Sequence, residues 1–129
     1  MRAALRRALV AALRTDAEAS LGDATWTTRC LHCRSGLTFD ASGAPLNGGT
    51  LEHVVPRSWF GKRAAEALIE GLEGPDDPKN LALACPRCNQ QKGKGPDAKG
   101  PSDDRSREIV AALQRARMAR WRDVDGAEP

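Results

Sequence analysis

The sequence predicts a small α+β domain in which short strands and a metal site are flanked by a helix at each end. Apolar residues recur at helical spacing near both ends, while the middle holds short β-branched runs separated by glycine and proline. Four cysteines stand in two pairs. The 129 residues suit one domain, and aromatic residues make up only 4% of them, so a metal staple would compensate for a small core.

The first predicted helix runs from Arg2 to about Ala19 and is expected to pack on the core as part of residues 1–24. Its apolar stripe repeats every fourth residue: Leu5, Leu9 and Leu13. Its arginines lie mostly off that stripe: Arg2, Arg6, Arg7 and Arg14. For these arginines a solvated face is favoured over a face that contacts DNA.

The cysteine pairs read Cys30-Leu31-His32-Cys33 and Cys85-Pro86-Arg87-Cys88. One such pair is ambiguous between a redox motif and half a zinc site, but two of them fit four thiolates around one structural zinc ion. That ion would tie distant segments together and leave no open position for chemistry. Unmetallated or redox-active cysteines are the alternative, although neither pair has a thioredoxin-like context. His32 is expected to be a bystander inside the first pair.

Between the cysteine pairs the sequence predicts two strands, an insert and a helix. Residues 37–39 and 50–55 flank a Gly-rich stretch that also holds Pro45 and Asn47, which predicts a hairpin with a long polar loop. Residues 58–72 carry Ala, Leu and Ile at helical spacing and are expected to form an inserted helix. A short strand at residues 80–84 leads into the second cysteine pair, and the helix that follows is expected to stop at Pro96 and its neighbouring glycines.

Glu52 and His53 are adjacent on the second of these strands, so their side chains are expected to point to opposite faces. If both serve one site, they must address different partners, such as a metal on one side and a water or phosphate on the other. A half-exposed pair at a strand end is the simpler interpretation of these two residues alone.

Together these motifs resemble the HNH (His-Asn-His) endonuclease family, in its zinc-bearing four-cysteine form. The matching elements are both cysteine pairs, Glu52-His53-Val54-Val55-Pro56, Asn80-Leu81 and Asn89-x2-Lys92-Gly93. The resemblance implies a small zinc-stabilised ββα-metal finger, flanked by N- and C-terminal helices. The nuclease domain is expected to occupy residues 25–96.

The resemblance also implies roles for individual residues. His53 would be the general base that takes a proton from the attacking water, a task that suits imidazole. Glu52 and Asn89 would hold a catalytic Mg2+ or Mn2+, for which carboxylate and amide oxygens are suitable ligands. Asn80 would fix the strand and loop that carry the base, without binding metal.

Other assignments follow less directly from the resemblance. Asn89 stands where the family name has its last histidine, and a helix N-cap is an alternative role for it. Glu52 stands where aspartate is common in the family. Lys92 and Arg57 are candidates for neutralising the phosphate charge of the substrate.

Residues 97–129 are expected to form a linker and an arginine-rich helix. A flexible basic linker is predicted at residues 95–101, then a helix from Ser102 to about Arg122, then a frayed tail. This helix has six arginines: Arg105, Arg107, Arg115, Arg117, Arg120 and Arg122. A solvated face and a phosphate-contacting face are equally favoured for them.

The net charge of +3 permits a nucleic-acid partner without demanding one. Short apolar runs argue against a membrane partner, so a cytoplasmic protein with reduced cysteines is expected. The resemblance implies a DNA endonuclease that leaves 5′-phosphate and 3′-hydroxyl ends and acts as a monomer or weak homodimer. The alternative is a zinc-stabilised nucleic-acid-binding module without catalysis, which would have no use for Glu52, His53 and Asn89 together. A toxin or effector nuclease domain is a weaker third hypothesis.

Overall fold

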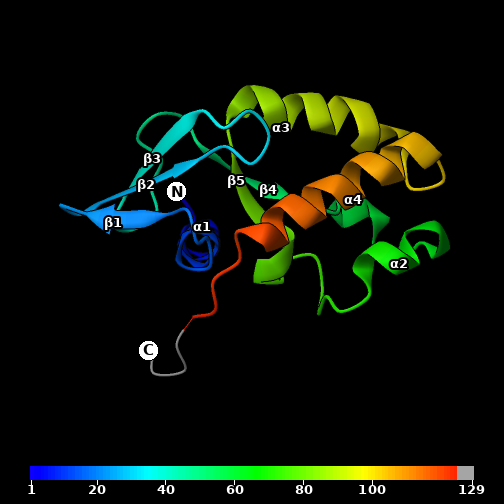
Figure 1. The fold of residues 1–129 in the computed structure, drawn as a ribbon, viewed down its shortest axis with the longest axis horizontal. Coiled ribbons are helices and arrows are strands. Elements are labelled where there is room, and N and C mark those ends of the chain that lie inside the picture. The colour runs from blue at the N-terminus through cyan, green and yellow to red at the C-terminus, as the bar shows by residue number, and fades with distance from the viewer. Residues whose placement is uncertain (125–129) are drawn as a thin grey trace.

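The structure, a computed structural model, describes residues 1–124 and contains two small antiparallel sheets and four α-helices (Figure 1). The helices are α1 (Ala3–Arg14), α2 (Glu66–Ile69), α3 (Pro86–Lys92) and α4 (Asp104–Ala119). The strands are β1 (Ser20–Gly22), β2 (Thr25–Arg29), β3 (Gly36–Asp40), β4 (Thr50–His53) and β5 (Leu81–Ala84). Within the described chain, no helix has the length and apolarity that crossing a bilayer requires. The α+β class predicted from the sequence is confirmed.

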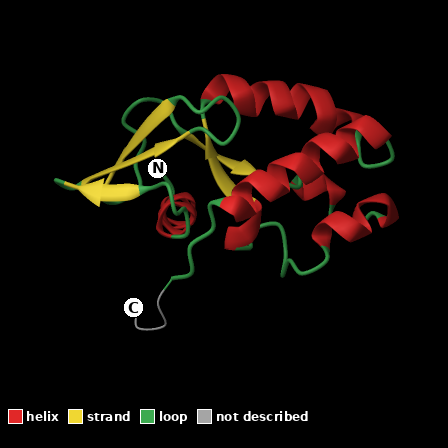
Figure 2. Cartoon of the chain, viewed as in Figure 1, coloured by secondary structure: helices red, strands yellow, loops and turns green. Residues whose placement is uncertain are grey.

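The two sheets lie on either side of α1, which contacts β4 and β5, and α3 packs on β4 of the second sheet (Figure 2). In the first sheet β2 pairs with both β1 and β3, and in the second β4 pairs with β5. The helix α3 starts directly after β5, so β4, β5 and α3 form the expected ββα unit.

The predicted hairpin between residues 37–39 and 50–55 is wrong, because these stretches belong to different sheets. The intervening loop closes on itself instead. The Asp40 carboxylate accepts hydrogen bonds from the backbone N–H groups of Ser42 and Ala44, at 2.9 and 3.0 Å. After this turn the chain enters β4, which pairs with β5 and not with β3.

The first helix is shorter than predicted, and the strands β1 and β2 follow it. The turn between them places Asp23 and Ala24 at φ values of 49° and 62°. Such a pair of positive φ values is typical of a hairpin turn whose usual sequence signal is Asn-Gly. Asp-Ala lacks that signal, which explains why the sequence did not predict this hairpin.

The inserted helix predicted over residues 58–72 is broken into short pieces, of which only α2 is α-helical. Gly61 adopts φ +85°, which interrupts the helix. The pieces are held by burial, since Trp59 and Ala65 are fully enclosed in an apolar cluster with Val55 and Val110.

The helix α3 ends at Lys92, directly before the glycines at its predicted stop, but the flexible linker predicted after it is wrong at its start. A further helical segment, Gly93–Asp97, continues α3 across a kink at Gly95 (φ −96°, ψ −106°). The proline that follows the kink has no N–H to satisfy, so it is tolerated there. The Trp59 indole donates to the carbonyl oxygen of Asp97 at 3.2 Å, which anchors the segment to the core.

Two arginines at the C-terminal end of α4 are buried, so neither the solvated face nor the phosphate-contacting face predicted for them applies. Arg117 donates to the Leu81 carbonyl oxygen and to the Thr15 hydroxyl, both at 2.6 Å. Arg120 forms a two-bond ion pair with Asp16, at 2.9 and 2.7 Å. Both arginines therefore join the C-terminal helix to the segment after α1. Of the predicted frayed tail, only its first two residues lie inside the described part of the chain.

Candidate active site and metal cluster

The loop between β2 and β3 lies beside the start of α3 (Figure 1), and the four cysteines of these two segments converge there. Their sulfur atoms all lie within 4.8 Å of one another, and Cys33 Sγ is 3.8 Å from Cys85 Sγ. Tetrahedral zinc with Zn–S bonds of about 2.3 Å separates its sulfur ligands by ~3.8 Å. All four cysteines are free thiols, so the cluster fits a zinc ion.

Hydrogen bonds and burial shift the pKa values of two cysteines in this cluster in opposite directions. Hydrogen bonds from the Ser35 side chain and backbone lower the pKa of Cys33 to about 6. Burial, reinforced by the neighbouring thiol of Cys85, raises the pKa of Cys88 to about 12. Four adjacent thiolates would repel one another, and a bound dication would offset their negative charge. Within residues 1–124 this is the only group of three or more Cys, His, Asp or Glu residues with ligand atoms this close.

Glu52 lies on the inner face of β4. Its side chain is 1% exposed, and its Oε1 is 2.5 Å from His32 Nε2. The other oxygen, Oε2, is buried and has no hydrogen-bond partner among the described residues. His32, expected to be a bystander, is thus the partner of the carboxylate that the resemblance assigns to the cation.

His53 has a separate set of partners at the surface. Its Nε2 is 2.7 Å from Asp76 Oδ1, and Arg57 donates to both oxygens of the same carboxylate, at 2.8 and 3.0 Å. Hydrogen bonds from His53, and then from Arg57, hold the pKa of Asp76 below its usual value. The side chain of His53 is 27% exposed, so water can reach it.

Asn80 is buried directly before β5, and its side chain bonds to the segment after β4 and to the turn that precedes Asp76. Its Oδ1 accepts from Val55 N–H at 2.8 Å, and its Nδ2 donates to the carbonyl oxygens of Val55 and Pro75, at 3.1 and 2.9 Å. These bonds join the end of β4 to the turn that carries Asp76.

Asn89 and Lys92 lie on α3 and both bond to the β4 strand. Asn89 Nδ2 donates to the Thr50 hydroxyl and the Leu51 carbonyl oxygen, at 3.0 and 3.2 Å, so its amide oxygen is the atom left for another ligand. Lys92 is 2% exposed, and its ammonium donates to the His53 carbonyl oxygen at 2.9 Å. Lys92 is therefore buried between α3 and β4, and its expected contact with a substrate phosphate stays a prediction.

Asp97 completes the buried polar group around Lys92. Its Oδ2 accepts from Lys92 at 2.9 Å, whereas Oδ1 is buried without a partner in the described chain. Burial raises the pKa of Asp97, while the Lys92 ammonium opposes that rise. An open hollow of about 240 Å³ lies alongside, lined by His32, Cys88, Gln91, Lys92, Pro96 and Ile109.

Sequence reasoning missed three residues of this region: His32, Asp76 and Asp97. His32 carried a usable signal, since it is one of only two histidines in the chain. Asp76 lies in an Asp- and Pro-rich turn, where acidic residues are ordinary. Asp97 lay in a stretch that its glycines and proline made look like a linker.

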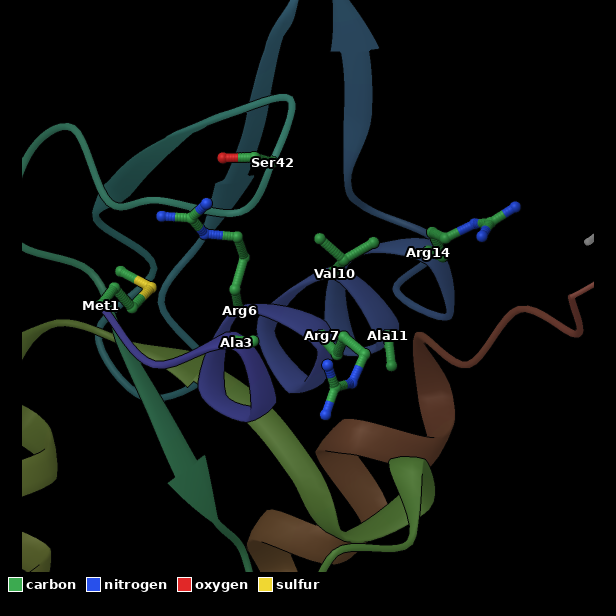
Figure 3. Close-up of a pocket in the computed structure, with 8 residues that line it drawn as sticks. All are labelled: Met1, Ala3, Arg6, Arg7, Val10, Ala11, Arg14 and Ser42. Atoms are coloured by element: carbon green, nitrogen blue, oxygen red, sulfur yellow. The ribbon is translucent and has the colours of Figure 1, made fainter.

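A larger hollow, of about 500 Å³, lies along α1 (Figure 3), and neither Glu52 nor His53 lines it. Its lining combines cationic and apolar side chains: Met1, Ala3, Arg6, Arg7, Val10, Ala11, Arg14 and Ser42. Arg6 points toward Ser42, while Arg7 points away from it (Figure 3). This side of α1 is basic and partly apolar, and it includes none of the residues assigned to catalysis.

An antiparallel strand pair followed by a helix, joined to a four-cysteine cluster that fits a metal ion, defines the molecule as a ββα finger. The family model described as HNH endonuclease matches residues 30–95, just over half of the chain. The chain belongs to the HNH endonuclease family. No curated protein and no solved structure gave a significant match to it.

Proposed function

We propose that this protein is a divalent-metal-dependent DNA endonuclease in which His53 is the general base. The observation that carries the proposal is the contact between His53 and Asp76, in a chain that belongs to a nuclease family. A carboxylate that accepts from Nε2–H selects the tautomer with a lone pair on Nδ1. Nδ1 of a partly exposed histidine is then available to take a proton from water.

Asp76 and Arg57 support this role from the surface. Asp76 holds the imidazole in one orientation and stabilises the imidazolium formed after proton transfer, as carboxylates beside catalytic histidines do. Arg57 is 63% exposed, so its guanidinium can hold Asp76 and still meet a phosphate group. The hydrogen bonds of Asn80 fix the position of His53 relative to Asp76.

The residues near β4 fit a hard divalent cation. Glu52 offers a buried carboxylate oxygen without a partner, and Asn89 offers its amide oxygen. We infer that these two atoms hold Mg2+ or Mn2+, which when bound would polarise the scissile phosphate and stabilise the leaving oxygen. Glu52 lies on the buried face of β4 and His53 on the exposed face, so the cation and the base would not compete for one side chain.

The four cysteines would hold zinc as a structural ion. All four ligand positions are taken by sulfur, so this ion would not take part in the reaction. It would fix the start of α3, and with it Asn89. The reaction would be phosphodiester hydrolysis that leaves 5′-phosphate and 3′-hydroxyl ends.

Incubation with supercoiled plasmid, with and without Mg2+ or Mn2+, tests the proposal. We expect metal-dependent nicking, and nicks that DNA ligase seals directly because they carry 5′-phosphate and 3′-hydroxyl groups. A folded, zinc-loaded protein that retards DNA in a gel but never cuts it would contradict the proposal. It would favour the non-catalytic binding module instead.

A further inference from the structure

We propose that His32 is a positioning residue for the catalytic cation, and that it links the cation site to the cysteine cluster. It would hold Oε1 of Glu52 so that Oε2 faces the ion. This inference rests on the proposed function, because it concerns the same cation. It adds a residue from outside β4 and α3, the elements that supply Glu52 and Asn89.

The first argument is the unequal state of the two Glu52 oxygens. Oε1 is 2.5 Å from His32 Nε2, whereas Oε2 is buried and unpartnered within residues 1–124. A buried carboxylate oxygen without a partner is unfavourable, so such atoms are rare unless a ligand completes them. His32 therefore restricts the carboxylate to one orientation and leaves one oxygen for a ligand.

The second argument is that Lys92, the buried basic side chain of this region, already has its own hydrogen-bond partners. The Lys92 ammonium is bonded to Asp97 Oδ2 and to the His53 carbonyl oxygen, both at 2.9 Å. Its charge is balanced by Asp97, so Lys92 leaves the Oε2 atom of Glu52 without a counter-charge. The missing partner of Oε2 is consequently expected to come from solution.

The third argument concerns access and position. His32 and Lys92 line the open hollow of about 240 Å³, so the His32–Glu52 pair lies next to solvent although Glu52 itself is buried. The backbone N–H of His32 donates to Cys30 Sγ at 3.4 Å, and the residue lies inside the first cysteine pair. The cysteine cluster therefore sets where the imidazole lies, and the imidazole sets where Glu52 points.

The test is Mn2+ binding measured by electron paramagnetic resonance on full-length, zinc-loaded protein without DNA. Residues that orient a metal ligand typically contribute 10- to 100-fold in metal affinity. We expect His32→Ala to weaken Mn2+ binding by about that factor. His32→Gln, which keeps a side-chain donor, should recover part of the loss. Gln91→Ala, an exposed change on the same hollow, serves as the matched control and should have no effect.

A double variant separates positioning from direct ligation. Glu52→Gln should weaken Mn2+ binding by itself, and His32→Ala added to it should cause little further loss if His32 acts through Glu52. Zinc content is measured for every variant, and if His32→Ala loses zinc, the comparison of His32→Gln with native protein decides. Unchanged Mn2+ affinity in a zinc-loaded His32 variant would overturn the inference. Unchanged affinity in Glu52→Gln would instead contradict the cation site of the proposed function.

Discussion

Asn80 and Val55 are joined by two hydrogen bonds, one in each direction, across the buried end of the ββα unit. A third bond runs from Asn80 to the Pro75 carbonyl oxygen. Val55 follows His53 by two residues, and Pro75 precedes Asp76. One buried amide therefore sets the distance between the proposed base and the carboxylate that orients it.

Replacing Asn80 with Ala should reduce both stability and cleavage. Each buried polar group left without its partner costs about 1–3 kcal/mol, so the free energy of unfolding should fall by about 3 kcal/mol. Urea denaturation measures this loss, with the exposed Gln90→Ala on α3 as the control. Equal stability of Asn80→Ala and native protein would show that the amide does not hold the strand.

Asp16→Asn should destabilise the protein and remove part of its acid sensitivity. Burial alone would raise the pKa of Asp16, but hydrogen bonds from Arg120 and Thr28 hold it below the usual value. A lowered folded-state pKa gives stability that is present above the unfolded pKa near 4 and is lost as the pH falls through the folded pKa. Removing one partner of a buried pair typically costs 3–5 kcal/mol.

Thermal unfolding of native protein and Asp16→Asn between pH 2.5 and pH 7 checks this prediction. The difference in stability should be largest at neutral pH and should shrink below about pH 4. The exposed Asp104→Asn at the start of α4 is a control for loss of negative charge. A difference that stays constant across the whole range would contradict the ion-pair explanation.

Zinc binding should release protons, and one of them should come from Cys88. At pH 7 the Cys33 thiol, with a pKa of about 6, is mostly ionised already, whereas Cys88, with a pKa of about 12, is protonated. Because zinc binds thiolates, the Cys88 proton must leave, and affinity should fall as the pH falls. Calorimetric titrations in buffers of different ionisation enthalpy count the released protons. Zinc binding without proton release at pH 7 would contradict this account of the cluster.

Asp76→Asn should slow cleavage without unfolding the protein, because Asp76 is 66% exposed. Loss of the orienting carboxylate should lower the single-turnover rate by about 10- to 100-fold, less than the 10²–10⁴ expected for the base itself. The pH dependence of the cleavage rate should change as well, because the carboxylate bonded to His53 is replaced by an amide. Glu70→Gln, an exposed carboxylate on the same insert, is the matched control. A rate equal to that of native protein would remove Asp76 from the mechanism.

The two strands and the helix of the ββα unit could be predicted because their signals are local, whereas only the resemblance implied that they form one unit. Pro56 ends a β-branched run, and Cys85 and Cys88 mark the start of α3. Helix α4 was also predictable, since Asp103 caps it through the Ser106 N–H at 2.9 Å. The helices at both ends were expected because apolar residues recur in them at helical spacing.

Features that depend on tertiary contacts could not be predicted. The pairing of β4 with β5 rather than β3 depends on which strand edges meet across an insert. The burial of Arg117 and Arg120 depends on where α4 crosses the segment after α1, which helical spacing does not encode. His32 and Glu52 lie on separate elements, so only folding reveals that they meet.

The most direct test of the central claim is single-turnover nicking of supercoiled plasmid by native protein and His53→Ala, in Mg2+ or Mn2+, at matched zinc content. The general base is expected to contribute 10²–10⁴ to the rate, so His53→Ala should cut at least about 100-fold more slowly. Its zinc content, Mn2+ affinity and DNA binding should stay unchanged, because His53 holds neither ion. A zinc-loaded, folded His53→Ala protein that cuts as fast as native protein would contradict the account.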